Sequence, residues 1–123
     1  MSAKQILLIE DDRQFHNFVK EVLESEDYAV LSAMNGAEAS KLLEEHTPDL
    51  ILTDLLMPEK DGVRLITEAR VSHPQTPIIA MSGGQSAFSP VFLEAATTLG
   101  AAHTLDKPFD DEQLLTLVRS CLN

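Results

Sequence analysis

The sequence of 123 residues is poor in aromatic residues, in cysteine and in positive charge, and each shortage excludes a class of protein. Tryptophan is absent and aromatic residues make up 5% of the chain, so we expect an aliphatic core. The single cysteine, Cys121, excludes a disulfide framework and is interpreted as a packing residue. The start of the chain carries neither a long apolar run nor a signal-peptide pattern, so we expect a soluble cytoplasmic protein.

Basic residues are few: nine Lys and Arg stand against 20 Asp and Glu, which gives a net charge of −11. Such a surface is poorly suited to neutralise nucleic-acid phosphates or to lie on anionic membranes, so we expect neither as a partner. The sequence also lacks the GxxxxGKS/T and GxGxxG patterns that cradle nucleotide phosphates. Partners that are basic, or that bring cations, fit this chain better.

Strand-type and helix-type patterns alternate five times in a length that suits one domain. This alternation is typical of βαβ units and predicts an α/β fold with a parallel sheet. Continuous apolar runs mark the strands, because strands of a parallel sheet are buried on both faces. We place the strands at about residues 5–9, 28–33, 49–53, 77–82 and 101–105.

Apolar residues at helical spacing, together with cap residues, predict the helices between these strands. The first helix has an apolar stripe that we expect to lie in the core: Phe15, Phe18, Val19, Val22 and Leu23. Start and stop signals bound the next helices, namely Asn35 with Pro48, Asp61 with His73-Pro74, and Ser89-Pro90 with Gly100. The last helix is expected from about Asp111 to Leu122.

Charged residues follow three of the predicted strands: Glu10 and Asp11 the first, Asp54 the third and Lys107 the fifth. In an open α/β sheet the carboxyl ends of the strands form the ligand site, so these side chains would meet at one edge. Two like charges about 4 Å apart repel by roughly 4 kcal/mol at an effective dielectric of about 20. A hard cation such as Mg²⁺ is therefore expected in the cluster. Asp12 is instead interpreted as an acid at the start of the first helix.

The same cluster suits phosphoryl transfer, which needs positioning and neutralisation of charge more than covalent chemistry by the protein. Asp54 would attack a phosphoryl group in line and form an aspartyl phosphate, while Mg²⁺ and Lys107 hold its oxygens. The hydroxyl of Ser82, at the end of the fourth predicted strand, completes the set.

With these residues in place, the whole chain resembles the receiver domains of two-component response regulators. The resemblance rests on four motifs in the right order: Glu10-Asp11, Asp54-Leu55-Leu56-Met57-Pro58 with Asp61-Gly62, Met81-Ser82-Gly83, and Lys107-Pro108-Phe109. It implies a flavodoxin-like (βα)5 fold, doubly wound around a parallel sheet of strand order 2-1-3-4-5. It also implies that the Lys107-Pro108 peptide is often cis.

The resemblance further implies a role for each site residue. Asp54 would be the phosphoacceptor, Asp11 a direct metal ligand, Glu10 a ligand through water, and the backbone carbonyl of Leu56 a further ligand. Ser82 would hydrogen-bond the phosphoryl group, and Lys107 would form an ion pair with it. The cofactor would be Mg²⁺, and the protein would be a signalling receiver and not an enzyme in the usual sense.

Two features depart from the family pattern. Thr104 stands where receivers commonly have a tyrosine or another aromatic, and the loop after Ser82 is longer and richer in glycine than in the chemotaxis-type receiver. A phosphohydrolase of the haloacid dehalogenase type is one alternative, but it needs a second Asp at position 56, which is Leu56. An unphosphorylated pseudo-receiver is another, and the intact set of site residues speaks against it.

We expect residues 1–123 to form a single stand-alone receiver with no output domain. Its phosphoryl group would come from a sensor histidine kinase or a histidine phosphotransfer protein. Its output would be a contact with an unknown downstream protein through the face made by residues 90–122. The four histidines share no metal-ligand spacing and are interpreted as ordinary surface or half-buried residues: His16, His46, His73 and His103.

Overall fold

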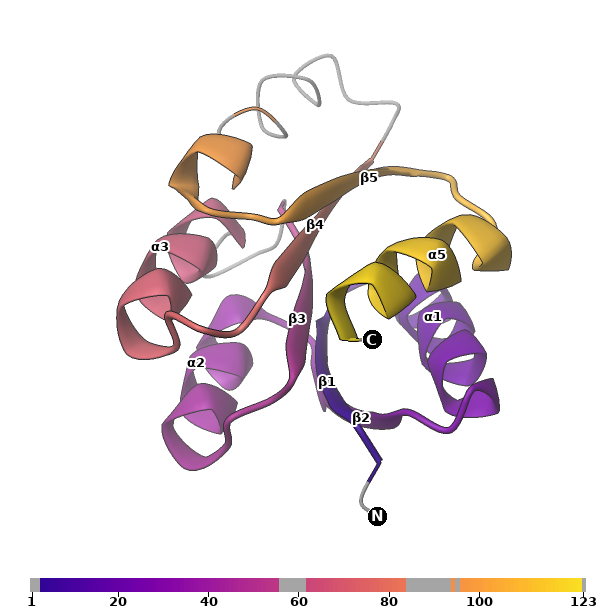
Figure 1. Cartoon of the computed structure of the whole chain (residues 1–123), viewed down its shortest axis with the longest axis horizontal. Coiled ribbons are helices and arrows are strands. Elements are labelled where there is room, and N and C mark those ends of the chain that lie inside the picture. The colour runs from indigo at the N-terminus through magenta and orange to yellow at the C-terminus, as the bar shows by residue number, and fades with distance from the viewer. Residues whose placement is uncertain (1–2, 56–61, 84–93, 95, 123) are drawn as a thin grey trace.

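The computed structural model describes residues 3–55, 62–83, 94 and 96–122. Five parallel strands form one sheet in the order β2-β1-β3-β4-β5, which confirms the predicted topology. All four strand pairs are parallel, as the crossover helices require (Figure 1). The strands are β1 (Gln5–Ile9), β2 (Ala29–Ala33), β3 (Leu50–Asp54), β4 (Ile78–Gly83) and β5 (His103–Lys107).

Helices cover both faces of the sheet, which confirms the doubly wound fold (Figure 1). One face carries α1 (Arg13–Ser25) and α5 (Asp111–Leu122), and the other carries α2 (Gly36–Glu45) and α3 (Gly62–Ser72). Glu94 and residues 96–99 are also helical. Within the described ranges, every helix is too short or too polar to cross a bilayer.

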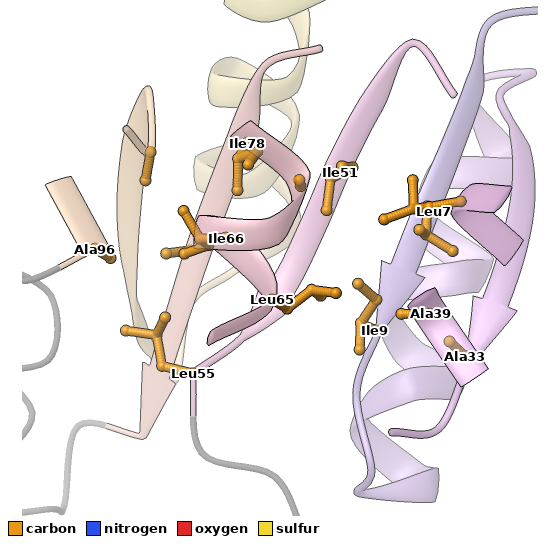
Figure 2. Packing of buried hydrophobic residues seen from close by; sticks show 14 residues of the cluster. Leu7, Ile9, Ala33, Ala39, Ile51, Leu55, Leu65, Ile66, Ile78 and Ala96 are labelled. Atoms are coloured by element: carbon orange, nitrogen blue, oxygen red, sulfur yellow. The ribbon is translucent and has the colours of Figure 1, made fainter. Parts of the chain in front are cut away.

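The core consists of two clusters, one on each face of the sheet. On the central strands the side chains alternate: Leu7 and Ile51 pack towards α2 and α3, whereas Leu8 and Leu52 pack towards α1 and α5. The first cluster is aliphatic throughout, as Figure 2 shows around Leu65. The second adds the buried ring of Phe109 to its aliphatic members. The sheet is thus a rigid support for the residues at its carboxyl edge.

Most of the predicted helix signals act as expected. The Asn35 carboxamide accepts a hydrogen bond of 2.8 Å from the Glu38 amide at the start of α2, and α3 ends at Ser72, before His73-Pro74. The Asp61 and Ser89-Pro90 signals lie outside the described residues. One part of the apolar stripe is wrong: the Phe18 ring is 37% exposed, because it lies at the outer border of the face that α1 buries.

The strand before Lys107 begins later than the sequence suggests. Gly100 ends the preceding helix with φ +120°, and the Ala101 amide donates back to the Ala96 carbonyl. Because this amide closes the helix, regular pairing with β4 starts at His103 and not at residue 101. At its other end β5 extends to Lys107, two residues beyond the expected end, and the Lys107-Pro108 peptide that follows is cis.

Gly100→Ala should destabilise the protein by about 1–3 kcal/mol, because alanine is strained at this φ. A Cβ atom there would also lie 2.7 Å from Cδ of Arg70, whose guanidinium is held by the carbonyls of His73, Pro74 and Thr76. Urea denaturation measures the loss. Gly83→Ala is the control, since nothing lies within 4 Å of its Cβ position. Equal stability of the two variants would contradict this account.

Candidate functional site at the carboxyl edge of the sheet

The ends of β1, β3 and β5 bring the predicted site residues together. Glu10 and Asp11 follow β1, Asp54 is the last residue of β3, and Lys107 is the last residue of β5. One carboxylate oxygen from each of the three acids lies within 4.8 Å of the others. The donors are hard carboxylate oxygens, which suit a divalent ion such as Mg²⁺, so the residues present fit a metal site.

Two of the three acids are buried. Glu10 is fully buried and Asp54 is 5% exposed, whereas Asp11 faces solvent. Burial raises the pKa of Glu10 to about 7, and the nearby charge of Asp54 adds to the rise. A hydrogen bond from Lys107 opposes this shift without cancelling it. The site therefore holds a carboxyl group that gains or loses its proton near neutral pH.

Lys107 is the counterion of the buried pair. Its ammonium donates to a carboxylate oxygen of Glu10 and, at 3.1 Å, to Oδ2 of Asp54. Burial by itself would lower the pKa of Lys107, but the hydrogen bond to Glu10 and the charge of Asp54 outweigh it and raise that pKa. The centroid of the Phe15 ring lies 4.5 Å from Nζ, which adds a cation–π contact to the ammonium.

Phe109 supports Phe15 in this position. The two ring centroids are 5.1 Å apart in an edge-to-face arrangement. Phe15 comes from the first turn of α1 and Phe109 follows β5, so the ring pair joins the two segments that carry the acidic turn and the lysine. The position of the ammonium is thus set by packing as well as by charge.

The turn that carries Glu10 and Asp11 is held through the backbone of Glu10. Its amide donates to the Ala33 carbonyl at 3.1 Å, and its own carbonyl accepts from Nδ1 of His16 at 2.9 Å. Its carboxylate accepts from the Asp12 amide at 3.0 Å. Asp12 in turn caps α1 by accepting from the Phe15 amide, which confirms its predicted role at the helix start.

His16 is the residue that sequence reasoning missed. It was expected at the surface or half-buried, but it is 4% exposed, because its ring turns inward to satisfy the Glu10 carbonyl. Its place three residues before the buried Val19, on the inward side of α1, is the signal that could have found it. The other histidines, His46, His73 and His103, are half-buried, as expected.

The remaining residues that the sequence analysis singled out differ in burial. Ser82 is buried near the end of β4, one residue beyond Met81, which pairs with Asp54. Thr104 is half-buried on β5, opposite Ala80. The carbonyl of Leu56 lies outside the described residues. Cys121 is half-buried against the α1 and α5 cluster, in agreement with a packing role.

Comparison with known proteins agrees with this arrangement. The model of the family described as the response regulator receiver domain matches residues 6–119. The transcriptional regulatory protein CpxR of Klebsiella pneumoniae is 38% identical over 118 residues, which are 96% of this chain and 49% of that protein. The chemotaxis protein CheY of Halobacterium salinarum is 31% identical over 121 residues, which are 98% of each chain.

Solved structures give the same result. The crystal structure of a CheY-like receiver domain protein from Methanospirillum hungatei superimposes with a TM-score of 0.89 at 29% identity, over 98% of this chain and 94% of that one. The chain spans about half the length of the CpxR proteins it matches and nearly all of the CheY protein. Because the family match covers almost the entire fold, this chain belongs to the response regulator receiver domains of two-component signalling, which are signalling proteins and not conventional enzymes.

Proposed function

We propose that this receiver accepts a phosphoryl group on Asp54 and signals by a change of shape to a protein partner. The observation that carries the proposal is the buried carboxylate of Asp54, which lies next to two further acids and 3.1 Å from the Lys107 ammonium. Asp54 supplies the nucleophile and Lys107 a fixed positive charge for the oxygens of the incoming group. The donor would be a sensor histidine kinase or a histidine phosphotransfer protein.

Each other residue of the site has a supporting part in this proposal. Glu10 and Asp11 would hold Mg²⁺ together with Asp54 and the Leu56 carbonyl. The bound ion would neutralise the negative charge on the phosphoryl oxygens. The Ser82 hydroxyl would donate a charge-assisted hydrogen bond to the new phosphoryl group. The Phe15 ring, whose centroid is 4.5 Å from Nζ, would remain in contact with the Lys107 ammonium while its carboxylate partners change.

A downstream partner would read the change on the side of the molecule that residues 90–122 form. In its described part this side includes β5 and α5, and β5 ends with Lys107 itself. A new bond between Lys107 and a phosphoryl group therefore acts directly on the end of this strand. Lys107 belongs both to β5 and to the proposed site, which supports this face as the surface that a downstream partner contacts.

Incubation with acetyl phosphate and Mg²⁺ should add one phosphoryl group to the intact protein, as seen by mass spectrometry. EDTA should abolish the addition, because the acidic cluster repels the donor without a cation. Asp54→Asn should also abolish it, whereas Asp49→Asn, directly before the first residue of the same strand, should react normally. A full mass shift in Asp54→Asn, or a mass shift of the wild type that EDTA does not change, would contradict the proposal.

Asp11→Asn should raise the melting temperature of the metal-free protein by a few degrees, since about 1 kcal/mol corresponds to roughly 4 °C in a domain of this size. The reason is that one of three mutually repelling carboxylates is removed. Mg²⁺ should raise the melting temperature of the wild type by mass action and that of Asp11→Asn much less.

Glu21→Gln removes the same charge from the exposed side of α1 and serves as the control for this experiment. It should leave both the metal-free melting temperature and the Mg²⁺ response nearly unchanged. If Asp11→Asn lowers the metal-free melting temperature, the repulsion argument is wrong.

A further inference from the structure

His16 is a buried polar residue to which the proposed phosphoryl transfer assigns no part. Its side chain is 4% exposed, and its Nδ1 donates to the Glu10 carbonyl at 2.9 Å. Its backbone amide donates to the Asp12 carbonyl at 2.8 Å. One residue of α1 therefore makes two hydrogen bonds back to the acidic turn, residues 10–12. This turn carries two of the three acids of the cluster.

Asp11 is the acid whose side chain has no partner of its own. Its carboxylate is exposed, and in the described ranges no hydrogen bond or ion pair joins it to another residue. The Glu10 carboxylate, by contrast, accepts from Lys107 and from the Asp12 amide. The Asp54 carboxylate accepts from Lys107 as well. The place from which the Asp11 carboxylate reaches the cluster is thus set by the backbone on either side of Asp11.

The two peptide planes beside Asp11 are each held by a hydrogen bond. The preceding plane contains the Glu10 carbonyl, and the bond from His16 fixes the direction of that carbonyl. The following plane contains the Asp12 amide, which donates to the Glu10 carboxylate at 3.0 Å. With both planes held, the backbone dihedral angles of Asp11 are fixed, and so is the direction in which its side chain leaves the chain.

We propose that His16 is a positioning residue that fits the acidic turn to a small divalent ion, an inference that rests on the proposed function. Mg²⁺ takes oxygen ligands at about 2.0–2.1 Å in near-ideal octahedral geometry, whereas Ca²⁺ accepts longer bonds of about 2.3–2.6 Å and irregular geometry. A turn held on both sides of Asp11 meets the stricter requirement. Residues that orient metal ligands without touching the metal typically contribute about 10- to 100-fold in affinity.

The second nitrogen of the His16 ring supports this role. Nε2 is buried and has no hydrogen-bond partner in the described part of the chain. A buried polar atom without a partner costs folding free energy, and an apolar side chain at this position would avoid that cost. The ring is therefore explained by what Nδ1 does for the acidic turn and not by packing alone.

The test compares two variants whose side chains have the same branched skeleton. His16→Asn keeps an N–H donor where Nδ1 stands, whereas His16→Leu has a methyl group there and no donor. Affinity for Mg²⁺ is measured near pH 8, without a phosphodonor, from amide chemical shifts in NMR. His16→Asn should stay within about threefold of the wild type, and His16→Leu should bind Mg²⁺ about tenfold more weakly. Wild-type affinity in His16→Leu, or equal loss in both variants, would overturn the proposal.

Ca²⁺ provides the readout that a merely structural role would not change. The acidic cluster has the same three carboxylates in the wild type and in His16→Leu, so its general attraction for cations is kept. His16→Leu should therefore lower the affinity for Ca²⁺ by less than about threefold while it lowers that for Mg²⁺ about tenfold. A parallel loss for the two ions would mean that His16 only keeps the turn folded, and would contradict the proposal.

His73→Leu is the matched control. His73 also donates from a ring nitrogen to a backbone carbonyl, that of His46 at 3.1 Å, but it follows α3 at the opposite edge of the sheet. Its loss should leave the Mg²⁺ affinity unchanged. If the wild type binds no Mg²⁺, the proposed function fails and this inference with it, whereas normal binding by both the wild type and His16→Leu removes only the role of His16.

Thermal melts show which variants fold. If His16→Leu does not, the wild type decides the question through the Nδ1 proton of His16, observed by NMR in protein with labelled histidine. The proton should be present, because the Glu10 carbonyl can only accept, and Mg²⁺ should slow its exchange with solvent as the turn is held more firmly. An Nδ1 atom without a proton, or exchange that Mg²⁺ does not change, would contradict the proposal.

Discussion

One ammonium stands between two buried carboxylates at the carboxyl edge of this sheet, and the proposed phosphoryl-transfer site depends on that balance. Glu10 and Asp54 are almost completely buried, and Lys107 donates to both. Burial raises the pKa of Glu10 to about 7, so a small change in the surroundings of this carboxyl group changes how much of it is ionised at neutral pH. A divalent ion at the acidic cluster, or a new partner for Lys107, would therefore change the balance of charge among Glu10, Asp54 and Lys107.

The fold makes this arrangement possible by being rigid elsewhere. Ile9 pairs with Thr53, and Asp54 pairs with Met81, so the carboxyl ends of β1, β3 and β4 lie side by side in a fixed register. Both faces of these strands are packed against helices, which leaves the carboxyl edge as the place where charged side chains emerge. Lys107 comes from the edge strand β5, and its ammonium contacts the Phe15 ring as well as the two carboxylates. The apolar layers stabilise the fold, whereas the repulsion among the clustered carboxylates opposes folding, as expected of a site kept for function.

The sequence pattern predicts the strands and the members of the acidic cluster, because continuous apolar runs and the charges that follow them report burial on both faces directly. The order of the strands was implied by the resemblance to receiver domains and not by the apolar runs. The sequence does not predict the inward turn of His16, since a lone histidine is compatible with a surface and with a core position until its carbonyl partner is known. It places the fifth strand two residues early. Ala101 and Ala102 suit a strand, but the Ala101 amide donates to the Ala96 carbonyl and closes the preceding helix. Phe18 shows the same limit: helical spacing identifies a stripe but not where its border meets solvent.

The most direct measurement of this account is the stability of Lys107→Gln near pH 8, without metal, alone and combined with Asp54→Asn. At that pH Glu10 of the wild type is mostly ionised, because its pKa is about 7 with Lys107 holding it down. Loss of the ammonium leaves Glu10 either as an unbalanced buried charge next to Asp54 or as an acid that must take up a proton, and both cost stability. The account predicts a loss of about 2 kcal/mol for Lys107→Gln, less than for a fully buried pair because the lysine side chain is 18% exposed. Asp54→Asn should recover much of this loss in the double variant, and the loss should shrink as the pH falls from above 8 to about 7, where Glu10 of the wild type is itself half protonated. Wild-type stability of Lys107→Gln at pH 8, or strict additivity of the two substitutions, would contradict the account.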